Sequence, residues 1–237
     1  MNTELRDILF LDIETVSITE DYAKLDERLK VQWARKANFF KRDELLSHED
    51  LFNQRAGIYA EFGKIVSVAV GMFIETEGTL RLRTKYFTSD HEKQLLLDFK
   101  ALLDKLDPAT KLCAHNGKEF DFPYLSRRML INGISLPNAL NLSGKKPWET
   151  PHLDTMEMWK FGDFKHYTSL DLLTAIFDIP TSKSVMNGSQ VSQVYYKEKD
   201  LKKISEYCVG DVVAIAQLYL RFKGLPLIAT EDIIQTE

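Results

Sequence analysis

The sequence predicts an α/β fold with a mixed central sheet flanked by helices. A near-continuous apolar segment over 7–13 predicts a first strand that is buried on both faces. The β-branched segment 64–74 and the alternating segment 79–88, separated by a short polar turn, predict a hairpin. Amphipathic helical segments then surround one further short strand, at 111–115. Because a hairpin is antiparallel and strands joined through helices can run parallel, we expect strands in both directions.

The other elements follow from apolar periodicity and from helix stop signals. The stretch from about 21 to 60 is rich in Lys, Arg, Glu, Leu and aromatic residues, which predicts a helical insertion after the first strand. Further helices are expected over 89–106, 122–132, 168–177 and 200–222, and loops over 135–151 and 180–192.

The predicted insertion carries basic side chains interleaved with aromatic ones. Trp33, Phe39 and Phe40 stand among its lysines and arginines. This pattern fits a solvated helix face packed by aromatic residues, and it also fits a clamp over a polyanion. We favour the solvated face.

Length and composition are those of a soluble globular protein. The chain has 237 residues, of which 44% are hydrophobic and 28% charged, so we expect a single domain over 1–237 that includes the insertion. Cys113 and Cys208 form no disulfide or metal-binding pattern and are expected as small buried side chains in a reduced setting. With no signal peptide recognised, and with an apolar run over 65–74 too short to cross a bilayer, we expect a cytoplasmic protein without membrane contacts. The net charge of −4 lowers the expectation of nucleic-acid binding but leaves room for a local basic patch.

Two carboxylates end the first predicted strand. Asp12 and Glu14 are two residues apart, so in a strand both side chains project from the same face. Like charges this close repel each other, whereas a divalent cation would let both stay ionised as ligands. Oxygen ligands suit hard ions such as Mg²⁺ or Mn²⁺. The pair alone is weak evidence, because it also fits a solvent-exposed turn.

A second polar cluster follows the strand at 111–115. His115 ends this strand, and Asn116 and Asp121 lie between it and the next predicted helix. Asp121 could be a metal ligand, or it could be a helix N-cap two residues before Pro123. Asn116 could be part of a simple turn, and His115 is expected as a hydrogen-bonded structural residue.

A third cluster lies within the last predicted helix. Tyr207 and Asp211 are four residues apart and therefore share one helix face. Gly210 between them is unfavourable inside a helix unless something approaches closely there. The alternative is a packed Tyr207 and a solvated Asp211.

Together, the three clusters resemble a known family. The segments LDIET, HNGKEFDFPYL and YCVGD occur in the order of the DEDD superfamily of 3′–5′ exonucleases, in the branch with tyrosine in the third motif. They are most similar to the proofreading exonuclease domain of family B DNA polymerases. The match spans nearly the whole chain, from residue 8 to about 221, except for the helical insertion and the MNGSQV loop. The resemblance implies a ribonuclease H-like fold and, since the chain has no room for a polymerase, a stand-alone exonuclease.

The resemblance also implies site residues and cofactors. Asp12, Glu14, Asp121 and Asp211 would bind two divalent ions, Mg²⁺ or Mn²⁺, and Tyr207 would orient the attacking water. Its ordinary pKa near 10 makes tyrosine a poor base at neutral pH.

The same resemblance implies contacts with the end of the substrate strand. Thr15, Asn116 and Phe120 would contact the terminal nucleotides, although core packing explains Phe120 nearly as well. Asp154 is close to the site in chain order and is expected as a structural partner.

The expected activity is hydrolysis of terminal phosphodiester bonds in single-stranded DNA. A first alternative is an exoribonuclease that trims RNA 3′ ends, since contact with the 2′-hydroxyl decides between the two substrates. A second is a catalytically idle nucleic-acid-binding module, which predicts at least one lost ligand, whereas all four carboxylates and Tyr207 are present. A third is an interaction domain with accidental acids, which the order of the three clusters argues against.

Overall fold

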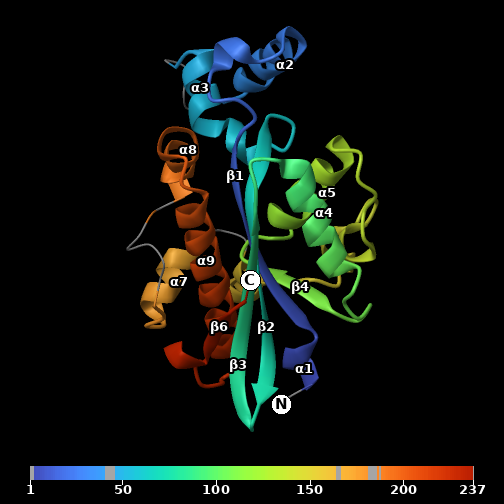
Figure 1. Cartoon of the computed structure of the whole chain (residues 1–237), viewed down its shortest axis with the longest axis vertical. Coiled ribbons are helices and arrows are strands. Elements are labelled where there is room, and N and C mark those ends of the chain that lie inside the picture. The colour runs from blue at the N-terminus through green and yellow to red at the C-terminus, as the bar shows by residue number, and fades with distance from the viewer. Residues whose placement is uncertain (1–2, 41–45, 164–166, 181–185, 187, 237) are drawn as a thin grey trace.

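A mixed β-sheet forms the centre of the molecule (Figure 1). The computed structural model describes residues 3–40, 46–163, 167–180, 186 and 188–236. Within these residues the strands are β1 (Ile8–Ser17), β2 (Gly63–Thr76), β3 (Thr79–Thr88), β4 (Lys111–Ala114), β5 (Leu153–Asp154) and β6 (Ile233–Gln235). Their order in the sheet is β5-β4-β1-β2-β3-β6. The pairs β1–β2 and β2–β3 are antiparallel and the other pairs are parallel, which confirms the predicted mixed sheet.

Helices cover both faces of this sheet. In Figure 1, α4 and α5 lie on one side and α9 on the other, while α2 and α3 lie beyond the end of β1. The helices are α1 (Thr3–Arg6), α2 (Glu27–Ala37), α3 (His48–Arg55), α4 (Glu92–Leu103), α5 (Asp121–Ile131), α6 (Thr155–Lys160), α7 (Leu170–Ile176), α8 (Val191–Gln193) and α9 (Leu201–Phe222). Over the described ranges, none of them is both long enough and apolar enough to span a membrane.

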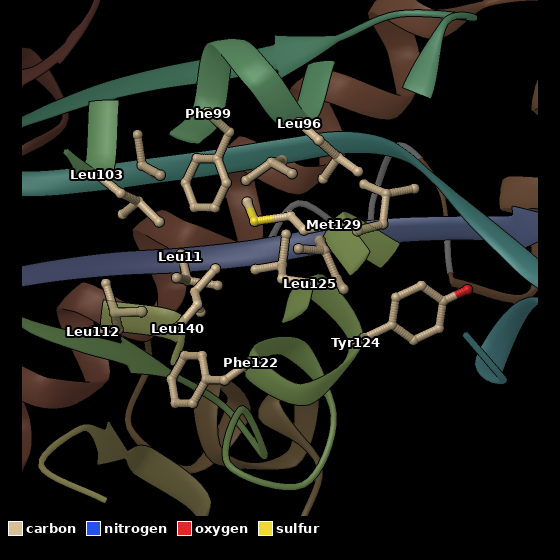
Figure 2. Packing of buried hydrophobic residues seen from close by; sticks show 14 of the residues in the cluster. Leu11, Leu96, Phe99, Leu103, Leu112, Phe122, Tyr124, Leu125, Met129 and Leu140 are labelled. Carbon is tan, nitrogen blue, oxygen red and sulfur yellow. The ribbon is translucent and has the colours of Figure 1, made fainter. Parts of the chain in front are cut away.

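Side chains along β1 point alternately to the two faces of the sheet. Leu9, Leu11 and Ile13 belong to the core cluster formed with α4 and α5, where Figure 2 shows the packing around Leu11. Ile8 and Phe10 pack into the second cluster, with α9. Since strand residues alternate between faces, the positions at 12 and 14 point toward α9. Two charged residues therefore continue an otherwise apolar row.

The first strand is longer than predicted. We expected it over 7–13, ending on two carboxylates, but β1 continues to Ser17 and pairs with β2 as far as Gly63. Asp12 and Glu14 therefore lie inside a paired strand and not at its end. The pairing register shifts between Glu14 and Thr15, so the ladder is irregular next to the carboxylates.

The hairpin is confirmed and its turn is tighter than expected. β2 and β3 are joined by Glu77 and Gly78 alone, both with positive φ, at 54° and 79°. Two central residues with positive φ form the type I′ turn that matches strand twist.

The helical insertion folds around its own small core. Trp33 of α2 is fully buried, and its indole N–H donates to the carbonyl of His48 at the start of α3, at 2.8 Å. Phe52 and Phe62 pack against the indole ring. This packing confirms the helices and the structural role expected for Trp33, whereas Phe39 is exposed.

A buried ion pair fastens the end of the insertion to the helices. Glu92 of α4 accepts hydrogen bonds from Arg128 of α5 at 2.8 and 2.6 Å and from the backbone N–H of Ile65. Arg128 also donates to the carbonyl of Ala60, at 2.8 Å. Because the charges are paired and hydrogen-bonded, the network fixes the start of β2 against α4 and α5.

Several short elements were not predicted. β5 and α6 follow directly after the predicted loop 135–151, and β6 lies beyond the last predicted helix. A two-residue strand has no periodicity of its own, and β5 exists because it pairs with Cys113 and Ala114 of β4. Residues 181–185 and 187 of the loop expected over 180–192 lie outside the described residues.

Candidate active site

The end of β4 leaves one edge of β1 open at the carboxylates. β4 pairs with β1 only along Ile8, Leu9 and Phe10. Beyond that point, the backbone N–H of Ile13 donates to the side chain of Asp121, in the first turn of α5. Asp121 is therefore not the N-cap, which is Phe120, so the N-cap alternative is wrong. A carboxylate from the α4–α5 side thus reaches β1 around its open edge.

On the other face, the carboxylates of β1 meet α9. The thiol of Cys208 lies 3.4 Å from Asp12 Oδ2 and 3.3 Å from the Asp12 carbonyl oxygen, to which it can also donate. One ligand atom each from Asp12, Glu14 and Cys208 lie within 4.8 Å of one another. We call these three residues the thiol–carboxylate cluster. Asp211 acts electrostatically on both carboxylates from the same helix.

The buried charges disfavour one another. Burial raises the pKa of Asp12 well above its usual range, and the charges of Glu14, Asp121 and Asp211 raise it further. Burial also raises the pKa of Glu14, with Asp211 and Asp121 adding to the effect. For Asp121, burial raises the pKa to about 7, although hydrogen bonds from its own N–H and from that of Ile13 oppose the shift. Without a counter-charge these carboxylates resist ionisation.

This donor set fits hard divalent cations. Four carboxylates, Asp12, Glu14, Asp121 and Asp211, interact through their charges in one place. Such oxygen-rich sites suit Mg²⁺ or Mn²⁺, and a bound cation would reverse the repulsion that raises the pKa values.

Tyr207 completes the α9 side of the site. Its side chain is buried and its hydroxyl is hydrogen-bonded to Asp211, one turn further along the helix. Burial, and then the charge of Asp211, raise its pKa above the ordinary value. The hydroxyl therefore remains protonated at neutral pH, and it donates to Asp211 while its lone pairs can accept.

A pocket opens beside these groups. It has a volume of about 190 Å³ and is lined by Asp12, His115, Tyr167, Ser169, Leu170, Asp171, Tyr207 and Asp211. Tyr167, which lines this pocket, is largely exposed, and partial desolvation, followed by the charges of Asp121 and Asp154, raises its pKa. The pocket gives a small ligand access to Asp12 and Asp211.

Asp154 holds the loop that leads to Asp121. Its buried carboxylate caps α6 by accepting from the N–H groups of Met156 and Glu157. It also accepts from the N–H of Asn116 at 3.0 Å and of Lys118 at 3.1 Å. The structural role expected for Asp154 is confirmed.

His115 is likewise structural. Its Nε2 lies 2.8 Å from the carbonyl of Thr168, so this nitrogen carries the proton and donates. Its Nδ1 then accepts from the hydroxyl of Thr155, at 2.9 Å. Burial lowers the pKa of the imidazole, which is consistent with a neutral ring at the edge of the pocket.

The residues predicted to contact substrate lie around the same carboxylates. Asn116 has a positive φ of 65°, and its buried Oδ1 finds no hydrogen-bond partner among the described residues. Phe120 packs partly into the core, with its ring 5.3 Å from that of Tyr124. The hydroxyl of Thr15 is hydrogen-bonded to Tyr124, which in turn donates to the carbonyl of Gly57 at 2.7 Å. These contacts fix the positions of Thr15 and Phe120.

The sequence analysis missed several residues of the site. Cys208 is buried, as expected, but it also contacts Asp12. Its place between Tyr207 and Asp211 in the chain was a usable signal, since residues three apart share a helix face. Asp171 reaches the pocket through tertiary folding, and no local pattern marks it.

Comparisons with known proteins show what the chain is similar to. Residues 58–232 match the model of a family described as predicted 3′–5′ exonucleases related to the exonuclease domain of PolB. Among solved structures, the family B DNA polymerase from the hyperthermophilic archaeon Pyrobaculum calidifontis is similar, with a TM-score of 0.53 and 15% identity over 90% of this chain. The alignment covers 24% of the polymerase chain. No curated protein matches the sequence significantly. The structural likeness shows the ribonuclease H-like fold that the resemblance of the motifs implied.

Proposed function

The chain belongs to the family of predicted 3′–5′ exonucleases related to the exonuclease domain of PolB, and we propose that it hydrolyses the terminal phosphodiester bonds of single-stranded DNA. The observation that carries the proposal is that the charges of Asp121 and Asp211 act on Asp12 and Glu14, while the Tyr207 hydroxyl is hydrogen-bonded to Asp211. Residues 1–237 act as one exonuclease domain in this proposal, with the helices of 21–60 as an insertion.

In the proposed mechanism, the four carboxylates hold two divalent ions, Mg²⁺ or Mn²⁺. When bound, such ions polarise the phosphoryl group and acidify the attacking water. Glu14 and Asp121 are buried, whereas Asp12 and Asp211 line the pocket, through which an ion can reach them. β1 fixes the spacing of Asp12 and Glu14. The raised pKa values of these groups indicate that the ion-free site is under electrostatic stress, which supports cation binding.

Tyr207 orients the attacking water. Because its hydroxyl proton is engaged by Asp211, an oxygen lone pair can accept a hydrogen bond from the water. Because the ordinary pKa of a tyrosine hydroxyl is near 10, it is a poor base at neutral pH, and the role proposed for Tyr207 is positioning. Glu14 accepts from the other side of the same water.

Three residues bind the strand end in this proposal. Thr15 contacts the terminal nucleotide from β1, and a base stacks on the ring of Phe120. The unpartnered Oδ1 of Asn116 supports a polar contact, because a buried acceptor without a donor is unfavourable until one is supplied. Contacts of these kinds do not depend on base identity.

The test is digestion of a 5′-labelled single strand with Mg²⁺ or Mn²⁺. The wild type is expected to produce a ladder that shortens from the 3′ end, and Asp12→Asn is expected to lose it. Asp98→Asn, an exposed carboxylate on α4, is the matched control and should digest like the wild type. Equal activity of Asp12→Asn and wild type would refute the proposal.

Substrate class is tested in the same assay. Matched DNA and RNA strands are digested side by side, and faster loss of DNA is expected. Faster digestion of RNA would show that the substrate is an RNA 3′ end and not DNA, and it would leave the proposed catalytic residues unchanged. Retained binding of the strand without any digestion would favour the idle binding module.

A further inference from the structure

A sulfur atom stands within the carboxylates of the site. Cys208 Sγ is 3.4 Å from Asp12 Oδ2, and the ligand atoms of the thiol–carboxylate cluster lie within 4.8 Å of one another. Hard ions such as Mg²⁺ bind oxygen ligands and bind thiols only weakly. Zn²⁺ and Cd²⁺, in contrast, bind sulfur and carboxylate oxygen together. The cluster thus offers a donor that the proposed hydrolysis does not require.

The spacing of these atoms matches the size of such an ion. Three atoms within 4.8 Å of one another fit on a circle with a radius of at most about 2.8 Å. Zn–O and Zn–S bonds are about 2.0–2.3 Å long, so each ligand atom needs to move inward by less than about 0.8 Å. Around a tetrahedral zinc, oxygen and sulfur ligands are about 3.5 Å apart. The separation of 3.4 Å between Asp12 Oδ2 and Cys208 Sγ already has this value.

We propose that Asp12, Glu14 and Cys208 form a binding site for a thiophilic divalent cation, Zn²⁺ or Cd²⁺, that overlaps the site for the hydrolytic ions. On binding, the S–H proton of Cys208 passes to solvent and the sulfur forms a bond to the cation, with no change of oxidation state. The thiol then no longer donates to the oxygen atoms of Asp12. The overlap rests on the proposed function, since it assigns the same two carboxylates to Mg²⁺ or Mn²⁺.

This arrangement gives the site two exclusive occupancies. A hard ion uses Asp12 and Glu14 as ligands and leaves the thiol protonated. A thiophilic cation is drawn toward Cys208 and holds the same carboxylates around itself. It therefore displaces the hydrolytic ions and inhibits digestion, even when Mg²⁺ is in large excess.

The chain supplies its own matched control. Cys113, the other cysteine, is also fully buried, but it lies on β4 and is not part of the cluster. A Cys113→Ser protein keeps Cys208 as its single thiol, and Cys208→Ser keeps Cys113. The two variants differ in whether a sulfur faces the carboxylates.

The first measurement is ultraviolet absorption during titration with Cd²⁺ in the absence of Mg²⁺. Cys113→Ser is expected to develop a thiolate-to-metal charge-transfer band with one equivalent of Cd²⁺, and Cys208→Ser is expected to show none. The dissociation constant for Cd²⁺ should rise about 10-fold or more in Cys208→Ser. If Cys208→Ser does not fold, Cys208→Ala provides the same comparison. A Cys113→Ser protein without the band would overturn the proposal.

The second measurement separates this inference from the proposed function. Digestion in Mg²⁺ is followed as Cd²⁺ or Zn²⁺ is added, and each variant is compared with its own activity before addition. We expect the inhibiting concentration to rise about 10-fold or more in Cys208→Ser and to stay unchanged in Cys113→Ser. Equal inhibition of both variants would refute the overlap. A charge-transfer band in a protein that digests no strand would instead refute the exonuclease and leave the cation site standing.

Discussion

Replacing Asp121 by asparagine should stabilise the metal-free protein while removing its activity. Asp121 is buried and its pKa is raised to about 7 from an ordinary 3.8. At pH 8 the folded protein must therefore hold a carboxylate ionised in surroundings that oppose the charge. Asparagine has nearly the same shape and no charge, so the substitution removes the cost of burying an ionised carboxylate. It also removes a proposed metal ligand.

The size of the effect follows from the shift in pKa. A rise of about 3 pKa units corresponds to about 4 kcal/mol of unfolding free energy at pH values above 7. Asparagine has one carbonyl oxygen for the two N–H groups that Asp121 accepts, and an unmatched donor costs about 1–3 kcal/mol. The net gain is thus about 1–3 kcal/mol, or a rise of about 2–12 °C in melting temperature for a chain of this size.

The gain should depend on pH with a definite sign. Between the unfolded pKa of Asp121 near 3.8 and the folded value of about 7, the folded state holds more protons than the unfolded state. This group therefore favours folding fully below pH 3.8, and its contribution is lost as the pH rises through 7. Asp121→Asn should be more stable than wild type at pH 8 and no more stable at pH 4.

Thermal and urea unfolding in EDTA at pH 4, 6 and 8 measure this difference, with Asp98→Asn as the control on the exposed face of α4. Addition of millimolar Mn²⁺ at pH 8 should stabilise the wild type and have a smaller effect on Asp121→Asn. An asparagine variant less stable than wild type at pH 8 in EDTA would refute the electrostatic reasoning. A wild type that is indifferent to Mn²⁺ would refute a preformed metal site.

Three further changes address other parts of the structure. Tyr207→Phe should lower kcat on a labelled strand about 10²-fold, because the water loses its acceptor, while the Mn²⁺-induced rise in melting temperature is retained. Asp154→Ala should lower the free energy of unfolding in urea by at least about 3 kcal/mol, because four backbone N–H groups lose their acceptor. His152 is neutral, with Nδ1 accepting from Leu112 N–H and Nε2 donating to the Ala139 carbonyl, and burial lowers its pKa. Its contribution to stability is therefore complete above pH 6.5 and is lost as the pH falls. Urea titrations at several pH values should show that the free energy of unfolding depends less on pH in His152→Gln than in the wild type.

The sheet could be predicted because its strands carry local signals. The apolar run before Asp12, the alternation over 79–88 and the turn at Gly78 are each visible within ten residues. β5 and β6 could not be predicted, since strands of two and three residues exist only through their neighbours. The extension of β1 past Glu14 was missed for the same reason: polar residues hid a strand that pairing with β2 maintains.

The candidate site was predictable in its residues and not in its contacts. The three motifs identified Asp12, Asp121 and Asp211 as candidates, and the family resemblance implied that they bind metal ions together. The contact of Cys208 with Asp12 spans 196 positions in the chain, and no spacing rule reaches that far. Asp154 accepts hydrogen bonds from four N–H groups in two segments, one near Asn116 and one at the start of α6. Because these segments are distant in the sequence, only the folded structure shows that Asp154 joins them.

The short pairing of β4 explains how acids from both faces of the sheet can act together. A sheet normally separates its two faces, and Asp121 and Asp211 come from helices on opposite sides of β1. Because β4 stops pairing at Phe10, the edge of β1 beside Asp12 is not covered by a neighbouring strand. An open edge leaves backbone donors without partners, and Asp121 satisfies one of them, the N–H of Ile13. This hydrogen bond also brings the Asp121 carboxylate, which comes from the α5 side of the sheet, close to the carboxylates on the α9 side. The end of the β4 pairing therefore creates the need for an acceptor at Ile13. The acceptor that fills it adds a negative charge that a cation would neutralise.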